Sequence, residues 1–364
     1  MVKKTVVIGM SGGVDSSVAA YLLKEQGYHV IGVTMNIWKK DGIEDTQRRG
    51  GCCGFGDIED AKRVAARIGI EHHVLNFQRD FKEAVITNFI EEYQEGRTPN
   101  PCIACNRYVK WQALLNRSIP MGADFISTGH YSKIVKNEKN GRYAIQRLSE
   151  NGKDQSYPLF NLSQEQLEKT IFPIGNYSKP EIRDIASKID YVTSVKPDSQ
   201  EICFIPDNDY GKYLEGVLEH LPPKGDFVDI EGNVLGKHKG IMHYTIGQRK
   251  NLGIAFGVPM YVKAIKKDEN IVVLSSDKDL YSDNLIADDL NFMYLGKEEI
   301  TDELEVYAKI RYSHEPTKAF ITLVEGGEKV QARFETPQRA ITPGQAVVFY
   351  DKDGHIVCGG TIVQ

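Results

Sequence analysis

The sequence predicts an α/β fold at the N-terminus, a doubly wound parallel sheet, followed by a small mostly β central domain and a C-terminal β-barrel. Up to about residue 130, apolar runs alternate with helical patterns, and a Ser- and Gly-rich turn follows the first apolar run. From about residue 206, short apolar segments are separated by Gly and Pro. Strands that alternate with helices favour a parallel sheet, whereas many short strands favour a barrel or sandwich.

The length of 364 residues predicts more than one domain. We expect an α/β domain over residues 1–205, a small central domain over 206–285 and a barrel over 286–364. No apolar run is long enough to cross a bilayer, and the N-terminus leads straight into a strand pattern, so we expect a cytoplasmic protein with no membrane partner. The net charge of -5 gives no overall sign of nucleic-acid binding, so any RNA surface is expected to be local.

The N-terminal elements follow from hydrophobic periodicity. Strands are predicted at 5–10, 30–35, 72–77 and 124–129, and helices at 57–68, 80–93 and 110–119, with a further helix beginning near Val18. Ligands of such sheets bind beyond the C-terminal strand ends. This rule brings the Ser11–Ser17 turn, Met35 and the pair Gly129-His130 to one edge of the sheet.

The later elements are short β-segments bounded by turn residues. In the central part they are expected at 226–230, 234–235, 261–265 and 271–275, the last two as a hairpin. In the C-terminal part they are expected at 306–310, 319–323, 330–334, 347–350 and 355–358.

The turn Ser11–Ser17 reads SGGVDSS and joins a strand to a helix, which makes it a candidate anion site. Gly12 and Gly13 let the backbone approach a phosphate closely, and Ser16 or Ser17 could cap the helix. The turn is no Walker A loop, because no Lys stands at the helix start. It resembles the PP-loop of ATP pyrophosphatases, in which Asp15 would help to hold Mg²⁺. An ordinary glycine turn is the alternative, which the strand–turn–helix context disfavours.

Two cysteine sites stand out. Cys102 and Cys105 form a Cys-x-x-Cys in the stretch NPCIACN, which we expect to be a loop, and Cys203 lies in the apolar stretch ICFI. Such cysteines are consistent with a redox pair, half of a zinc site, or part of an iron–sulfur site. The adjacent Cys52-Cys53 are interpreted as a loop feature, and Cys358 as a core residue.

Seven motifs occur in order along the chain: GMSGGVDSS, NPCIACN, STGHY, KDQSY, ICFI, GQRKNLGI and TPGQ. Together they resemble the bacterial tRNA-specific 2-thiouridylases, the MnmA family within the PP-loop ATP pyrophosphatase superfamily, over essentially the whole chain. The resemblance implies an ATP-dependent exchange of the carbon-2 oxygen of the wobble uridine for sulfur, with release of AMP and pyrophosphate. It also implies that the C-terminal barrel docks tRNA.

The resemblance implies roles for individual residues. ATP would be bound by Gly9, Met10, Ser11, Gly12, Gly13, Val14, Asp15, Ser16, Met35 and Gly129, with Mg²⁺ at Asp15. Cys203 would carry the persulfide and Cys105 would be the second catalytic cysteine, with a Cys105–Cys203 disulfide as the end state. A sulfur-carrier protein or cysteine desulfurase would supply the sulfur.

The tRNA contacts implied by the resemblance are Asn100, Pro101, Cys102, His130, Lys153, Asp154, Gln155, Arg311, Tyr312 and Gln345. Cys102 departs from the family pattern, because well-known members have Asp there. A thiol does not replace a carboxylate simply, so Cys102 could be a substitute base, another nucleophile or a cluster ligand. An iron–sulfur-dependent tRNA thiolase using Cys102, Cys105 and Cys203 is therefore the alternative. A small-molecule ligase of the superfamily and a non-catalytic tRNA-binding protein are further ones.

Overall fold

The computed structural model describes residues 3–38, 55–148, 153–198, 202–205, 209–255 and 257–364. These residues form two compact units. Unit 1 comprises residues 1–85, 102–204 and 353–356, and unit 2 comprises residues 86–101, 205–352 and 357–364. Within the described ranges, no helix combines the length and the apolar character that a membrane crossing requires.

Unit 1 is built on a parallel sheet with the order β3-β2-β1-β4-β7. The strands are β1 (Thr5–Gly9), β2 (His29–Asn36), β3 (Glu71–Asn76), β4 (Phe125–Ser127) and β7 (Thr170–Ile171). The central strand β1 pairs with β2 on one side and β4 on the other, both in parallel. The C-terminal ends of these three strands therefore lie at the same edge.

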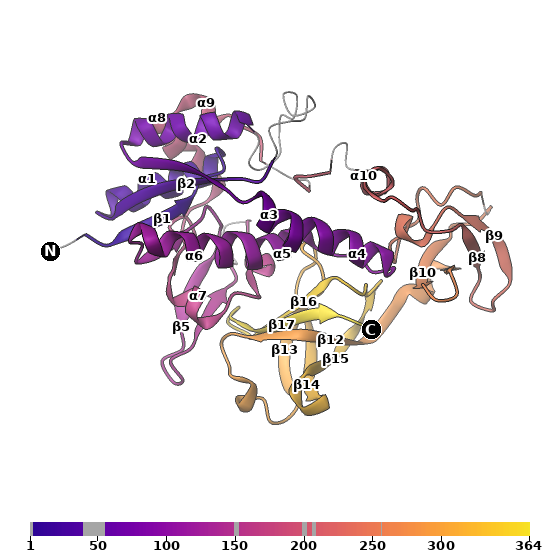
Figure 1. Ribbon diagram of the computed structural model, residues 1–364. Helices are drawn as coiled ribbons and strands as arrows, with labels where there is room; N and C mark the ends of the chain where they lie inside the picture. Colours follow the sequence, from indigo (N-terminus) through magenta and orange to yellow (C-terminus); the bar gives the residue numbers. More distant parts are fainter. Residues whose placement is uncertain (1–2, 39–54, 149–152, 199–201, 206–208, 256) are drawn as a thin grey trace. The chain divides into compact units, whose positions relative to one another are not determined.

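Helices cover the sheet (Figure 1). On one face, α1 (Val14–Glu25), α2 (Phe55–Ile68) and α8 (Lys179–Ile189) share a core with β1 that includes the fully buried Val6 and Ile8. The helical run α5 (Pro101–Ala104), η3 (Cys105–Ala113) and α6 (Leu114–Ser118) buries Trp111 and Leu114. The apolar stripe of α2 packs against β2 and β3, whereas that of α8 packs against α1.

The remaining described elements of unit 1 are short. They include α3 (Gln78–Phe81), the hairpin β5 (Lys133–Lys136) with β6 (Tyr143–Gln146), α7 (Gln164–Glu168) and α9 (Tyr191–Ser194). A π-helical stretch, η2 (Lys82–Thr87), follows α3 and leads into α4 (Asn88–Gln94), which belongs to unit 2. The helix start of α8 is fixed by a capping box between Ser178 and Glu181.

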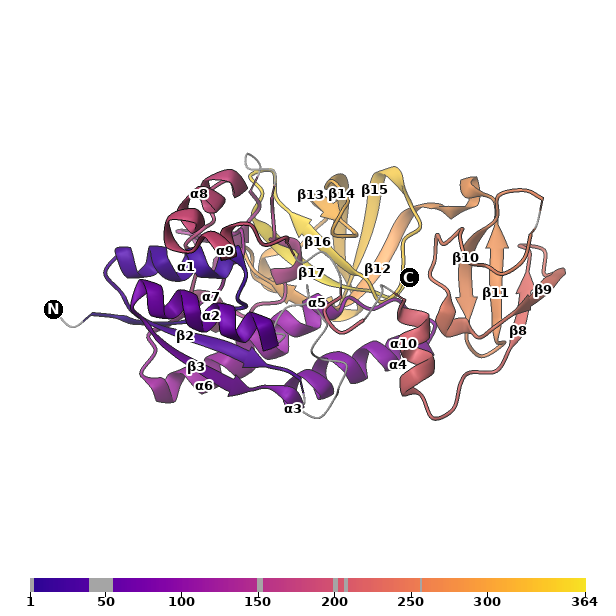
Figure 2. The same cartoon turned by 90° about the horizontal axis from the view of Figure 1, so that it is seen from above.

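Unit 2 holds a four-stranded sheet with the order β10-β11-β8-β9, seen side by side in Figure 2. Its strands are β8 (Gly225–Val228), β9 (Val234–His238), β10 (Tyr261–Lys266) and β11 (Ile271–Ser275). Their core contains Phe227, Val262 and Leu274. The helix α10 (Tyr210–Val217) precedes this sheet in the chain.

The rest of unit 2 is a closed barrel with the order β12-β15-β14-β13-β16-β17. Its strands are β12 (Tyr281–Phe292), β13 (Leu304–Lys309), β14 (Thr317–Val324), β15 (Lys329–Arg339), β16 (Ala346–Tyr350) and β17 (Ile356–Ile362). The long strand β12 pairs with both β15 and β17, which closes the barrel. Inward-facing Ala319, Ile321 and Phe349 belong to its core.

The predicted fold class is confirmed: a parallel α/β sheet, a small central β-sheet and a C-terminal barrel are all present. The sequence did not predict β12, because its polar residues (YSDNLIADDLNF) mask the alternating pattern. The predicted loop around Cys102 and Cys105 is wrong, because a helical run begins at Pro101, where proline is well suited to a first helical turn. Cys52 and Cys53 lie outside the described residues.

We expect Phe349→Ala to destabilise the barrel by about 3–5 kcal/mol, because it empties a fully buried aromatic position. Urea unfolding followed by circular dichroism measures this. Phe320→Ala is the matched control, because Phe320 is only partly buried and faces Lys318 and Arg333 outside the barrel core. An equal loss in both variants would contradict the assigned inward and outward faces.

Candidate active site

The turn between β1 and α1 is confined by its glycines. Gly12 has a φ of +71°, and a Cβ there would lie 2.2 Å from the backbone oxygen of Asp57 in α2. Gly13 is the N-cap of α1, with extended backbone angles. Position 12 therefore admits only glycine, because its backbone is left-handed and because α2 lies so close to it.

The serines of the turn do not cap α1 as expected. Gly13 is the N-cap and no side chain caps the helix. The hydroxyls of Ser16 and Ser17 instead donate back to the Gly13 carbonyl, at 3.2 and 2.8 Å. They sit inside the first turn, where a hydroxyl reaches a preceding carbonyl more readily than an N–H ahead of it. The Ser11 N–H donates to Ser16 Oγ at 3.2 Å, which folds the turn on itself.

Other predicted residues gather at the same sheet edge. A Cβ on Gly129, beyond the end of β4, would lie 2.5 Å from the backbone nitrogen of Ser16. A Cβ on Gly9, at the end of β1, would lie 3.7 Å from the Met35 Cε of β2. Met10 is buried, and its carbonyl accepts a hydrogen bond from Thr34 Oγ1 at 2.8 Å. The expected grouping of the turn, Met35 and Gly129 is therefore present.

Asp15 lies in the first turn of α1 and has three donors around its carboxylate. Tyr131 Oη donates to Oδ1 at 2.7 Å, Lys179 Nζ lies 2.7 Å from Oδ1, and Lys153 Nζ lies 3.3 Å from Oδ2. The same two lysines also contact Asp198, Lys153 at 2.9 Å and Lys179 at 2.7 Å. Asp15 and Asp198 are thus joined through two shared cations.

The electrostatics of this group follow from those contacts. Burial alone would raise the pKa of Asp198, but hydrogen bonds from Lys179 and Lys153 outweigh it and lower the pKa to about 2. Burial, followed by the charge of Asp15, raises the pKa of Tyr131, so its hydroxyl stays protonated as a donor. Arg183 adds a further contact to Asp198 at 3.2 Å.

On another side of the turn stands Lys196. Its Nζ donates to the Gly12 carbonyl at 3.2 Å and lies 2.7 Å from Asp57 and 2.6 Å from Asp60, both in α2. Sequence reasoning missed Lys196, together with Lys179 and Asp198. The available signal was the KPD triplet, which three residues separate from the ICFI motif, but nothing in its spacing shows that it contacts a turn more than 180 residues earlier.

The cysteines have different settings. Cys102 is exposed in the first turn of the helical run, and Cys105 is half-buried where a π-helical stretch begins, a feature frequent at functional sites. Cys203 is half-buried beside Phe204, whose ring packs edge-on against Phe81. None of the described cysteines is in a disulfide. Cys358 is fully buried in the barrel core, as predicted, and this burial raises the pKa of its thiol to about 12.

Four predicted tRNA contacts lie in unit 1 beyond the cysteines. His130 Nδ1 lies 2.7 Å from Thr128 Oγ1, and burial, with smaller effects from Lys110 and Lys153, lowers its pKa well below the usual range. The imidazole is therefore neutral. Asp154 accepts from the N–H groups of Leu148 and Ser156, and Gln155 accepts from the Tyr131 N–H. Lys153 belongs to the Asp15 group.

The others lie in unit 2. Gln345 Nε2 donates to the carbonyls of Thr98 at 2.8 Å and Pro99 at 3.2 Å. It therefore binds the segment that directly precedes Asn100 and Pro101. Arg311 donates to Ala340 and Thr342, whereas Tyr312 is half-exposed. Gln345 and Asn100–Pro101 are thus brought together.

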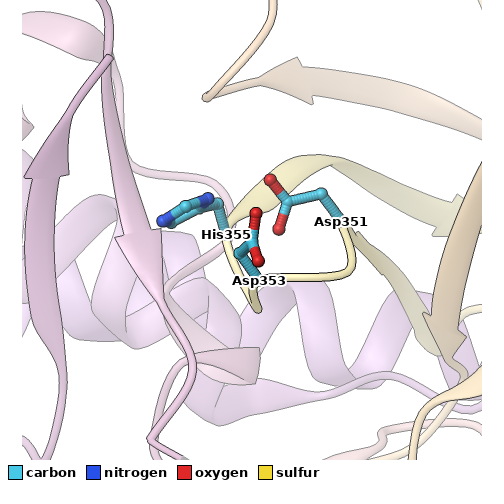
Figure 3. A group of neighbouring side chains, drawn as sticks. All are labelled: Asp351, Asp353 and His355. Carbon is cyan, nitrogen blue, oxygen red and sulfur yellow. The ribbon is translucent and has the colours of Figure 1, made fainter. Parts of the chain in front are cut away.

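A separate cluster lies in the connection between β16 and β17, where Asp351, Asp353 and His355 each offer a ligand atom within 4.8 Å of one another (Figure 3). Acidic groups on exposed loops commonly gather in this way without an ion, so we assign no metal site to them.

Three family models match the chain. A tRNA methyl transferase HUP domain matches residues 4–207, a tRNA methyl transferase PRC-barrel domain matches 211–276, and an aminomethyltransferase beta-barrel domain matches 282–363. The chain is 55% identical to a tRNA-specific 2-thiouridylase MnmA of Lachnoclostridium phytofermentans over 361 residues, 99% of this chain and 100% of that one. It is 51% identical to one of Acetivibrio thermocellus over 364 residues, 100% of both chains.

Among solved structures, a 4-thiouridine synthetase–RNA complex with bound ATP is similar at 17% identity. The match covers 58% of this chain and 50% of that one, with a TM-score of 0.34.

We expect Gly12→Ala to destabilise unit 1, because alanine costs about 1–2 kcal/mol in a left-handed backbone and its Cβ would also overlap the Asp57 backbone. The measurement is the thermal unfolding midpoint. Gly13→Ala is the control, since a Cβ there meets Ser11 Oγ at 3.4 Å and the φ is negative. Equal midpoints for the two variants would refute the constraint on Gly12.

Proposed function

The chain belongs to the tRNA-specific 2-thiouridylase family, and on that premise we propose that it is an ATP-dependent tRNA-uridine 2-sulfurtransferase. The observation that carries the proposal is the SGGVDS turn: its Gly12 and Gly13 carbonyls accept hydrogen bonds from within the protein, at the start of α1. Such a turn presents N–H groups to an anion. Cys105 and Cys203 belong to the same unit.

In this proposal ATP lies along the turn from Gly9 to Ser16, with Met35 and Gly129 at the nucleotide. The uridine O2 attacks the α-phosphorus, the bond to the bridging oxygen breaks, and pyrophosphate leaves, so the poor leaving group at C2 becomes an adenylate. Asp15 offers the carboxylate oxygens that Mg²⁺ prefers, and its lysine neighbours can turn toward phosphate oxygens instead. Bound there, Mg²⁺ would offset the phosphate charge.

Sulfur transfer then uses two thiols. The terminal sulfur of a persulfide on Cys203 adds to C2 and AMP leaves. The Cys105 thiolate attacks the Cys203 sulfur, the S–S bond breaks with its electron pair left on the base sulfur, and a Cys105–Cys203 disulfide remains for an external dithiol to reduce. Only a thiolate is nucleophilic, so both cysteines require a positive environment. A sulfur-carrier protein or cysteine desulfurase would reload Cys203 in the cytoplasm.

For tRNA we propose that Asn100, Pro101 and Cys102 contact the target base. The further proposed contacts are His130, Lys153, Asp154 and Gln155 of unit 1 and Arg311, Tyr312 and Gln345 of the barrel. The exposed ring of Tyr312 and the neutral imidazole of His130 suit contacts to bases, which favour stacking and edge hydrogen bonds. The proposed division into residues 1–205, 206–285 and 286–364 assigns the chemistry to the first part and tRNA docking to the last.

The test is a sulfur-transfer assay with ATP, Mg²⁺, a persulfide donor and unmodified tRNA, followed by nucleoside mass spectrometry for 2-thiouridine. We expect product with the wild type, together with AMP. Cys105→Ser and Cys203→Ser should fall to the level without enzyme, because each removes a nucleophile. Cys102→Ser should retain activity.

Cys358→Ala is the matched control, because this thiol is buried in the barrel core and has no role in the proposed sulfur transfer. Loss in all three of the other cysteine variants, with iron bound to an anaerobic preparation, would favour the iron–sulfur alternative. AMP formation without 2-thiouridine in the wild type would overturn the proposed substrate.

A further inference from the structure

The side chain of Lys196 contacts a backbone atom of the SGGVDS turn, not one of its side chains. Its Nζ donates to the carbonyl of Gly12 at 3.2 Å, and the same ammonium group contacts the carboxylates of Asp57 and Asp60 at 2.7 and 2.6 Å. The two carboxylates are three positions apart in α2 and so lie on one face of it. Lys196 is therefore fixed between a helix and the turn.

The direction of one carbonyl fixes the direction of the next N–H. The described peptide bonds are all trans, and in a trans peptide the C=O and the following N–H point to opposite sides. With the Gly12 carbonyl drawn to Lys196, the Gly13 N–H must point away from Lys196. A flipped peptide would turn the carbonyl, an acceptor, toward the side where an anion needs a donor.

The Gly12–Gly13 peptide is free to flip unless something holds it, because the flip rotates ψ of Gly12 and φ of Gly13, and both residues are glycines, which occupy positive and negative φ about equally well. The other carbonyl of the pair, that of Gly13, is already held by Ser16 and Ser17. Lys196 supplies the corresponding restraint for Gly12.

The same short segment reaches the turn a second time. Asp198, two residues after Lys196, contacts Lys153 and Lys179, which in turn contact Asp15. Arg183 of α8 holds the segment in place by donating to the carbonyls of Ser194 and Lys196. One segment thus restrains the turn at Gly12 and at Asp15.

We infer that Lys196 is a positioning residue for the ATP site: it holds the Gly12–Gly13 peptide in the orientation that presents the Gly13 N–H to the phosphates. The inference rests on the proposed use of ATP at this turn and deepens it. Lys196 acts through the backbone and does not itself touch the nucleotide.

The experiment measures the affinity of the full chain for Mg²⁺ and α,β-methylene-ATP, which cannot be split between its α- and β-phosphates, by titration calorimetry. Lys196→Met should weaken binding about 10-fold or more, the usual scale for losing one charge-assisted hydrogen bond. Lys196→Arg, which keeps the charge, should restore most of the affinity. The affinity for adenosine, which has no phosphates, should change less than 2-fold.

Lys188→Met is the control, because Lys188 is exposed on α8 and the same chemical change there should leave the affinity for the analogue unaltered. If Lys196→Met proves unfolded by thermal scan, Asp57→Asn loosens the same lysine and should also weaken analogue binding. Wild-type affinity in the folded variant, or equal losses for adenosine and the analogue, overturns the positioning role alone. A wild type that binds no analogue overturns the proposed function and this inference together.

Discussion

The shared ion pairs of Asp15 and Asp198 are the interaction on which the site depends. Parallel strands bring the turn, Met35 and Gly129 to one edge, but a sheet fixes only the positions where chains leave it. Lys153 and Lys179 each contact both carboxylates, so the first turn of α1 is joined to residues far along the chain. Such half-buried pairs are screened less than surface pairs, and removing one member leaves its partners uncompensated.

The close surroundings of the turn explain why most of its residues are glycine or small and polar. Gly12 has no room for a side chain because α2 approaches its backbone. The hydroxyls of Ser16 and Ser17 donate to the Gly13 carbonyl within the turn itself. Rigidity comes from hydrogen bonds and charges supplied by α2, α8 and the 196–198 segment. A site that must bind a strongly charged ligand benefits from donors that are already oriented, because no reorganisation is then required.

Much of the fold and part of the site could be predicted from the sequence. Periodicity located β1, β2, α2 and the β10–β11 hairpin, and the turn chemistry located Gly12, Gly13 and Asp15. Periodicity could not reveal β12, because polar residues flank its short apolar segments and hide the alternation. It also could not reveal the helical run from Pro101, because the Asn-Pro pair there suggested a loop. Lys179, Lys196 and Asp198 were missed because ion pairs across long sequence separations leave no local pattern.

Closure of the barrel has a consequence for the order in which the protein is made. Because β12 is the first barrel strand and pairs with β17, the last, the ring cannot form until β17 has emerged from the ribosome. Until then, β12 and its neighbours form an open sheet with an unpaired edge, the kind of surface that recruits strands from other chains. The nascent barrel is therefore vulnerable to misassembly between the synthesis of β12 and that of β17. The polar residues of β12 suit this interval, because they keep the unpaired edge soluble.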